Sequence, residues 1–329
     1  MRNVLKIGIV LMACAGLRAQ DTVTASYTQT NLVSDVSGIA LHTDPNLKNP
    51  WGLSRGASTY WWASDEATGL STLYDGSGNI GPLVVKVPPP SGTGKGTPTG
   101  TVALGSKFIF VTLDGTISQW SSGNAAVLKV NHSASGASYT GCTLATRNSA
   151  QTLYVANAAS GVEAYTTAFA PVTLPSGAFV DPNVPAGYTP YGIQSVGTKI
   201  YVTFAQFTAG AGKGFVDVFD VNGTLLLSLQ HGTWMNQPWG IAHAPATFGK
   251  FSNTILVGNV GSGQIHAFNA STGKHLGALA DAAGHAIANP GLWAIGFGTG
   301  GLSGPATTLY FAAGINSYLH GLFGTITAN

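Results

Sequence analysis

The chain has 329 residues, of which only 8% are charged, and its formal net charge is +2. This composition, with 45 glycines and 10% aromatic residues, excludes a disordered chain and a strongly basic nucleic-acid-binding protein. Many short strands joined by glycine-rich turns fit it better.

The first segment, residues 1–19, is predicted to be a secretory signal peptide. Basic residues precede the apolar run 7–17, and Ala19 supplies a small residue for cleavage. Its removal leaves 11 basic against 12 acidic residues, a net charge of about −1, and leaves Cys142 without a disulfide partner. We therefore expect a secreted or periplasmic protein without a membrane span, with a lipid anchor through Cys14 as the minor alternative.

A Pro-x-Gly phrase or a close variant begins each of six units. The glycines of the first five units are separated by 48, 41, 51 and 48 residues, and the prolines of the last two units by 52. Periods of this size are typical of propeller blades and solenoid repeats. The six phrases are Pro50-Trp51-Gly52, Pro98-Thr99-Gly100, Tyr139-Thr140-Gly141, Pro190-Tyr191-Gly192, Pro238-Trp239-Gly240 and the shifted Pro290-Gly291-Leu292.

Each unit then repeats the same order of short strands. A short apolar strand is followed by a β-branched and aromatic run such as 108–112, a third run such as 215–219, and a fourth such as 225–229. Four antiparallel strands per unit are typical of a propeller blade, so we predict an all-β, six-bladed β-propeller over residues 20–329. The predicted blades are 49–95, 96–137, 138–187, 188–235, 236–287 and 288–329.

The sixth unit ends at Ile326, which leaves no room for a fourth strand. Residues 24–33 form a spare strand of suitable composition near the start of the mature chain. We expect this strand to pair outside residues 322–326 and to close the ring, because two unpaired terminal edges would expose backbone hydrogen-bonding groups.

Residues 153–157, Leu-Tyr-Val-Ala-Asn, resemble the NHL-type propeller repeat in their place after Pro-x-Gly. A second resemblance, to an uncharacterised family of secreted bacterial propeller proteins, covers nearly the whole mature chain. Its motifs are Asn31-Leu32-Val33-Ser34-Asp35, His42-Thr43-Asp44-Pro45-Asn46, Asn49-Pro50-Trp51-Gly52-Leu53, Pro88-Pro89-Pro90 and the closing Gly321-Leu322-Phe323-Gly324. The resemblance implies a propeller but no established activity or catalytic residue. Some members carry a PEP-type C-terminal sorting tail, which this sequence to Asn329 does not contain.

Polar residues begin the turns between the second and third strands. In a propeller these turns lie on the same face as the Pro-x-Gly loops, beside the mouth of the central channel, so their side chains are candidates for a ring around a ligand. The alternative is that Asp and Asn cap the turn by accepting hydrogen bonds from the backbone, which is their common role where strands reverse. The residues are Asp65, Asp114, Asn157, Gln206, Asn259 and Asn316.

The residue after each repeated proline is aromatic in some blades and threonine in others. Large rings occupy this position in blades 1, 4 and 5, with another near the sixth copy: Trp51, Tyr191, Trp239 and Trp293. Blades 2 and 3, on the other side of the ring, have Thr99 and Thr140. Aromatic rings at a channel mouth can stack on sugars or other flat ligands, and this uneven distribution predicts a one-sided cup. The alternative is that the rings fill space between adjacent blades.

Histidines His42, His231 and His285 lie in loops before a repeat and are candidate ligands for a divalent metal such as zinc or copper. None of their spacings is a local metal motif, and exposed loop histidines are the alternative. We predict no cofactor beyond this possible metal.

No Gly-x-Ser-x-Gly, His-Glu-x-x-His or phosphate-binding loop is present, so no catalytic residue is assigned. We predict a monomeric binding module, and favour it over an enzyme. Its partner would be a small molecule, a glycan or a protein on the channel-mouth face. The competing predictions are a lactonase- or lyase-like enzyme and a structural surface or matrix protein. The binding candidates are Trp51, Asp65, Asn157, Tyr191, Gln206, Trp239, Asn259 and Asn316, and the enzyme's metal would be held by Asp65, Asn157, Asn259 and a histidine.

Overall fold

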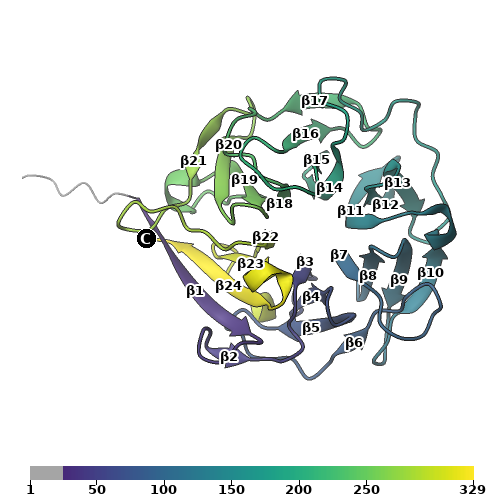
Figure 1. Ribbon diagram of the computed structural model, residues 1–329, viewed down its shortest axis with the longest axis horizontal. Helices are drawn as coiled ribbons and strands as arrows, with labels where there is room; N and C mark the ends of the chain where they lie inside the picture. The colour runs from purple at the N-terminus through teal and green to yellow at the C-terminus, as the bar shows by residue number, and fades with distance from the viewer. Residues whose placement is uncertain (1–24) are drawn as a thin grey trace, which may run out of the picture.

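The computed structural model describes residues 25–329, whose strands form six sheets arranged radially around a central channel (Figure 1). The prediction of an all-β, six-bladed propeller is confirmed. The predicted signal peptide and Cys14 lie outside the described residues. The innermost strands are β3 (Pro50–Ser54), β7 (Pro98–Leu104), β11 (Tyr139–Arg147), β14 (Thr189–Val196), β18 (Pro238–His243) and β22 (Leu292–Phe297).

The remaining strands of each blade follow outward in antiparallel order. The second strands are β4 (Trp61–Asp65), β8 (Lys107–Thr112), β12 (Ala150–Asn157), β15 (Lys199–Ala205), β19 (Thr254–Asn259) and β23 (Leu309–Ala313). The third strands are β5 (Leu70–Tyr74), β9 (Thr116–Trp120), β13 (Gly161–Thr166), β16 (Phe215–Phe219), β20 (Ile265–Asn269) and β24 (Leu322–Ala328). The fourth strands are β6 (Val85–Lys86), β10 (Val127–Asn131), β17 (Leu225–Ser228) and β21 (His275–Ala278). Four blades therefore have four strands, whereas the third blade has three.

The sheet of the sixth blade has five strands, in the order β2-β1-β24-β23-β22. Strand β1 (Tyr27–Ser34) is antiparallel to β24, with Tyr27 opposite Ala328 and Ser34 opposite Leu322. The short β2 (His42–Thr43) pairs with β1 in parallel, one strand more than the four expected. The two ends of the described chain thus lie side by side in one sheet, as the purple and yellow strands of Figure 1 show.

Burial follows the order of the strands from the channel outward. Every residue of β4 and of β23 is buried, because second strands pack against the adjacent blades on both faces. Between blades 1 and 2, for example, Trp62 stacks on Phe108 with ring centroids 3.9 Å apart. The outer β10 instead alternates between exposed and half-buried residues. The core therefore lies between the sheets.

The glycine of the repeated phrase lies where innermost strands of neighbouring blades come closest. A Cβ added to Gly100 would lie 2.5 Å from the backbone nitrogen of Cys142, and one added to Gly240 would lie 2.5 Å from the carbonyl oxygen of Trp293. Real Cβ atoms do not approach backbone this closely, so only glycine fits here. The close approach of innermost strands in the channel wall therefore explains why glycine recurs in the phrase that identifies the fold.

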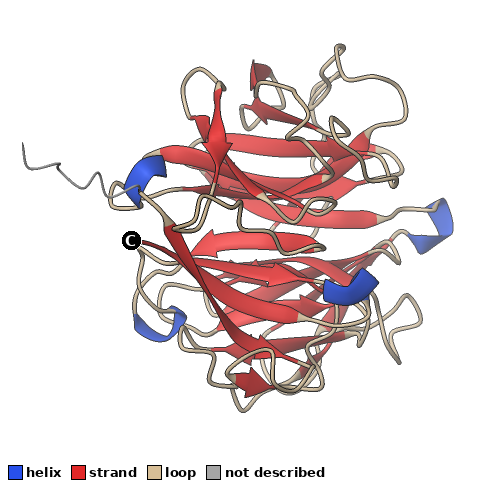
Figure 2. Cartoon of the chain, turned by 60° about the vertical axis from the view of Figure 1, so that its left-hand side comes forward, coloured by secondary structure: helices blue, strands red, loops and turns tan. Residues whose placement is uncertain are grey.

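Helical turns are confined to the loops between strands (Figure 2). They are α1 (Ile315–Tyr318) and three 3-10 turns at Ser133–Ser135, Gly249–Phe251 and Gly301–Ser303. Within residues 25–329, none of these helices has the length and apolar character that a membrane crossing requires.

Candidate functional site

Four aromatic side chains from four blades meet at one end of the channel, and we call Trp51, Tyr191, Trp239 and Trp293 the aromatic cluster. Trp51 stacks on Trp293 with ring centroids 3.6 Å apart, while Trp239 and Tyr191 meet the Trp51 ring edge-on at 6.5 and 6.1 Å. Three of the four are buried, and Trp239 is half-buried. The rings pack on one another and fill this end, in place of the expected one-sided cup or separate wedges between blades.

Hydrogen bonds fix two indoles of the cluster. Trp239 reaches from blade 5 to blade 3, where its Nε1 donates to the carbonyl oxygen of Thr140 at 3.0 Å. Trp293 Nε1 donates to Asn49 Oδ1 at 2.9 Å. Trp51 Nε1, by contrast, is buried and has no hydrogen-bond partner among residues 25–329. Such a donor costs free energy unless another group satisfies it.

The two threonines at the same position in blades 2 and 3 bind the neighbouring blade. Thr99 Oγ1 donates to the carbonyl oxygen of Tyr139 at 2.7 Å, and Thr140 Oγ1 donates to that of Pro190 at 3.3 Å. Both side chains are fully buried. Threonine therefore links adjacent innermost strands at these positions, while the large rings of the other blades cover the channel.

Among the polar turn residues, Asp65 is fully buried at the end of β4. Its Oδ2 accepts hydrogen bonds from the backbone nitrogen and the hydroxyl of Thr72, at 3.1 and 2.8 Å. Its Oδ1 has no partner among residues 25–329. Burial raises the pKa of Asp65 well above its usual value. The carboxyl group therefore ties the end of β4 to β5 within blade 1.

Asn157 and Asn259 hold backbone in the same manner. Asn157 Oδ1 accepts hydrogen bonds from the backbone nitrogens of Ser138 and Ala159, both at 3.0 Å. Asn259 Oδ1 accepts one from the backbone nitrogen of Asn236 at 2.8 Å. In accepting hydrogen bonds from the backbone, Asn157 and Asn259 act as turn caps, the alternative to ligand binding. Their side-chain oxygens therefore have less hydrogen-bonding capacity left for a ligand.

The last two polar candidates, Gln206 and Asn316, belong to loops beside the aromatic cluster. The carbonyl oxygens of Gln206 and Phe207 accept hydrogen bonds from Gln237 Nε2 at 2.8 and 2.9 Å, which fixes the start of the loop after β15. Phe207 itself is 79% exposed. In the loop after β23, Tyr318 packs on Trp293 with centroids 5.7 Å apart. Both loops thus present aromatic side chains at this end of the channel.

The three candidate metal ligands lie apart in the structure. His42 belongs to β2, beside blade 6, and His231 Nε2 lies 2.8 Å from the carbonyl oxygen of Gly212 after blade 4. His285 lies 3.6 Å from Asp281 in an exposed loop after blade 5. Across the described part of the chain, no group of three or more His, Cys, Asp or Glu side chains could hold a metal ion.

A polar cluster that the sequence did not reveal lies in blade 3. Glu163 Oε2 accepts a hydrogen bond from Tyr139 at 2.9 Å, and Oε1 accepts one from Asn157 Nδ2 at 2.7 Å. Burial alone would raise the pKa of Glu163, but hydrogen bonds from Tyr165, Asn157 and Tyr139 outweigh it and lower that pKa. The carboxylate is thus fully engaged in linking the three strands of blade 3.

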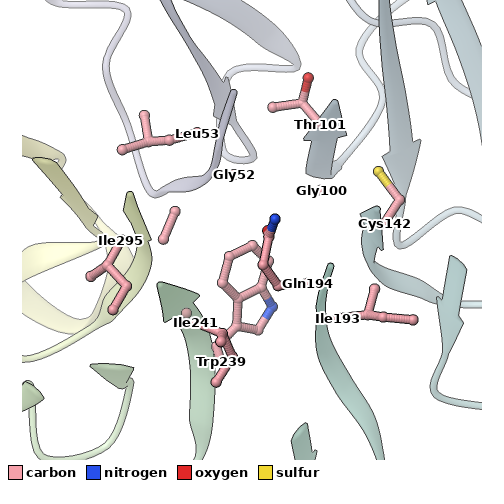
Figure 3. A pocket seen from close by; sticks show the side chains of 12 residues that line it. Gly52, Leu53, Gly100, Thr101, Cys142, Ile193, Gln194, Trp239, Ile241 and Ile295 are labelled. Carbon is pink, nitrogen blue, oxygen red and sulfur yellow. The ribbon is translucent and has the colours of Figure 1, made fainter. Parts of the chain in front are cut away.

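Beyond the aromatic cluster, the middle of the channel contains a small cavity (Figure 3). About 30 Å³ of it is open to the centre of a water molecule, which is room for about two waters. The indole of Trp239 lies across the channel in Figure 3, and the Cys142 sulfur points toward its interior. Burial raises the pKa of the Cys142 thiol, which makes it a poor nucleophile.

The far end of the channel is open. A second cavity of about 220 Å³, by the same measure, shares Leu53, Gln194, Ile241 and Ile295 with the first. It continues to residues farther along the same strands, including Arg55 and His243. All innermost strands run in the same direction along the axis, so the aromatic cluster, at the starts of these strands, closes one end of the channel. We call the open cavity at the other end, which Arg55 and His243 border, the funnel. Sequence analysis missed Arg55, whose signal was a charged residue directly after an innermost strand.

No protein-family model matches this chain. Its relatives include uncharacterized proteins of Acanthamoeba polyphaga mimivirus. One is 28% identical over 327 residues, covering 90% of this chain and 78% of that protein. Another is 26% identical over 339 residues, covering 92% of this chain and 86% of that protein. The chain is thus a β-propeller whose relatives are uncharacterized viral proteins.

Solved structures with the same fold include a glucose dehydrogenase and a streptogramin B lyase. The dehydrogenase superposes with a TM-score of 0.60 at 12% identity, covering 92% of this chain and 100% of the other. The lyase superposes with a TM-score of 0.53 at 12% identity, covering 93% and 98%. At this identity the likeness shows the fold alone, since one propeller shape serves unrelated functions.

Proposed function

We propose that this protein is a binding module that recognises a glycan or a protein partner on the face that carries the aromatic cluster. The observation that carries this proposal is the convergence of four aromatic rings at one end of the channel, with the exposed Tyr318 packed on Trp293 and the exposed Phe207 in the loop after β15. Because the rings leave no deep opening there, a ligand lies across the face. Aromatic rings offer large contact area to sugar rings and to apolar side chains.

Backbone strain beside the cluster supports the same proposal. Asn316, Ser317 and Tyr318 have φ values of 52°, 57° and 68°, so three consecutive residues other than glycine adopt the left-handed conformation. This conformation is unfavourable for residues with a side chain, and such strain is concentrated at binding sites. Here it holds the Tyr318 ring against Trp293, with 41% of Tyr318 exposed.

The test is a glycan array together with a binding screen of secreted proteins, followed by two alanine variants. Phe207→Ala and Tyr318→Ala should each weaken binding about tenfold without a loss of folding, because they remove exposed contact rings. Leu226→Ala is the matched control, since Leu226 is 51% exposed on the outer strand of blade 4. Equal binding by all three variants would contradict the proposed face, whereas unfolding would show that the rings are structural.

The competing enzyme, a metal-dependent lactonase or lyase, is addressed by a separate measurement. Within residues 25–329 it lacks a cluster of three His, Cys, Asp or Glu ligands. One equivalent of zinc or copper in the purified protein, measured by mass spectrometry, would nevertheless favour it over a binding module.

We also infer that β1 closes the ring and that the protein is exported through residues 1–19. The pairing of β1 with β24 supports the first inference. The inference of export is supported by the composition of residues 1–19 and by the resemblance to secreted bacterial propellers. Detection of the mature chain beginning near residue 20 outside the cytoplasm would test export.

A further inference from the structure

The open end of the channel contains a half-buried positive charge that has no counter-charge among residues 25–329. Arg55 directly follows β3 and lines the funnel. Its Nε is buried without a hydrogen-bond partner, and Arg55 belongs to none of the ion pairs or side-chain hydrogen bonds found within residues 25–329. Since a buried donor left unpaired is costly, the Nε of this guanidinium favours a ligand that supplies the missing acceptor.

The guanidinium is also held in place. Its carbon lies 4.7 Å from the ring centroid of Trp61, a contact that orients the planar group against a flat surface. Trp61 is itself fixed, because its Nε1 donates to the carbonyl oxygen of Ser303 at 2.9 Å. Burial lowers the pKa of Arg55 to about 10, so the group still carries its charge at neutral pH.

The rest of the funnel suits an anion with an apolar body. Of its lining residues, none is Asp or Glu, so nothing in the wall repels a negative charge. His243 adds an exposed polar group at the mouth, and Gln194, also exposed, adds one where this cavity meets the one in the middle of the channel. Leu53, Ile241 and Ile295 supply apolar wall farther in. With about 220 Å³ available, the space admits a small organic molecule.

We propose that this end of the channel binds a small organic carboxylate, whose carboxylate pairs with the Arg55 guanidinium while its apolar part contacts the Leu53, Ile241 and Ile295 walls. The guanidinium fork matches the two oxygens of a carboxylate, and this pairing gains strength in a partly desolvated site. A single arginine with apolar walls favours a monocarboxylate over phosphate. This site lies at the opposite end from the aromatic cluster and does not depend on the function proposed above.

The test uses calorimetric titration of the full mature chain with acetate, butanoate and benzoate, and with benzamide as the neutral counterpart of benzoate. We expect saturable binding of the carboxylates, tightest for benzoate, and none of benzamide. Arg55→Gln should weaken benzoate binding about tenfold or more, because it removes a charge-assisted pair. Lys129→Gln, on the outer β10, removes the same charge and should bind as the unmodified protein does.

A second variant keeps Arg55 and its packing on Trp61. Gln194→Glu adds a carboxylate to the funnel wall at an exposed position and should also weaken benzoate binding, since like charges repel. Benzoate should in addition raise the melting temperature of the unmodified protein but not that of Gln194→Glu. Absence of carboxylate binding, equal binding of benzamide, binding of inorganic phosphate alone, or retention of affinity in both variants would each overturn the proposal.

Discussion

The two ends of the channel are built from the same six innermost strands, yet they differ in chemistry. At one end, Trp51, Tyr191, Trp239 and Trp293 pack together and leave no opening. At the other end, Arg55 and His243 border a funnel. Between them, glycines such as Gly100 allow the strands to approach. The repeat therefore determines the channel wall, while positions on either side of each glycine are free to vary and carry the specific chemistry.

The channel has two distinct ends only if the blades form a continuous ring. We therefore expect the largest loss of stability from removing β1. Deleting residues 21–34 removes the strand paired with β24 together with the buried Tyr27, Leu32 and Val33. Each buried side chain stabilises by about 2 kcal/mol, and an unpaired β24 edge adds to the loss. We expect the melting temperature, measured by calorimetry, to fall by at least about 10 °C.

The control for this truncation is deletion of residues 21–25 alone, which precede β1. It should leave the melting temperature close to that of the mature chain. An unchanged melting temperature in the longer deletion would show that β1 does not close the ring.

A pair of identical substitutions compares the channel wall near each end. Gly240→Ala places a Cβ 2.5 Å from the Trp293 carbonyl oxygen, whereas Gly296→Ala at the open end meets the Trp61 ring at 3.2 Å. Backbone cannot yield as a side chain can, so we expect Gly240→Ala to lower the free energy of unfolding by about 3 kcal/mol and Gly296→Ala by about 1 kcal/mol. Urea denaturation measures the free energy of unfolding of both variants. Equal losses would contradict the expected difference between a backbone contact and a side-chain contact.

Opening the closed end should change access to the channel interior. Trp239→Ala removes the indole that crosses to blade 3 and should cost about 2 kcal/mol in unfolding free energy, since Trp239 is half-buried. It should also speed alkylation of Cys142, which lines the cavity next to Trp239. Mass spectrometry after a timed iodoacetamide reaction measures this rate.

The control for this experiment is Trp234→Ala, which removes a half-buried indole that stacks on His275 in the outer part of blade 5. Its Cys142 should react as slowly as in the unmodified protein. If both variants react at the same rate, Trp239 does not close the channel.

The smallest effect is a pH dependence that arises away from both ends. Burial, and secondly His275, lower the pKa of His266 in blade 5 to about 4, below its unfolded value of about 6.5. The unfolded chain therefore takes up this proton first, and the contribution of His266 to stability is lost as pH falls from about 6.5 toward 4.

His266→Gln should flatten that part of the stability profile without changing benzoate binding or Cys142 alkylation. The comparison is made between the two proteins because Asp217, whose pKa burial raises to about 6, acts with the opposite sign as pH rises from about 4. A constant difference in melting temperature between them from pH 7 to pH 4 would contradict the assignment.

The fold was predictable because its signals are local and repeated. Pro-x-Gly or a close variant, followed by aromatic and β-branched runs, recurs in all six units, and six copies suffice to indicate a ring. The absence of a fourth strand in blade 3 was not predicted, because the four-strand pattern of the repeat was extended to every unit. The short β2 was also unforeseen, because two residues give no periodic pattern.

The candidate site was predictable only in part. The structure has Trp51 and Trp239 at one end of the channel, but whether such rings splay apart or pack together depends on distances across the channel, which the sequence does not contain. The hydrogen bonds of Asn157 depend likewise on partners in neighbouring loops. Arg55 was overlooked because its position after an innermost strand indicates only that it lies at the end of the channel, whereas its lack of a partner is visible only in the structure.

The pairing of β1 with β24 has a consequence for biosynthesis and engineering. A ribosome makes β1 almost three hundred residues before its partner β24, so β1 stays unpaired while those residues are synthesised. Because the Asn329 backbone nitrogen donates to the Ser26 carbonyl oxygen at 3.0 Å, a short peptide can join these neighbours. A circular permutant reopened in an exposed loop such as 121–125 would then carry both strands on one uninterrupted hairpin.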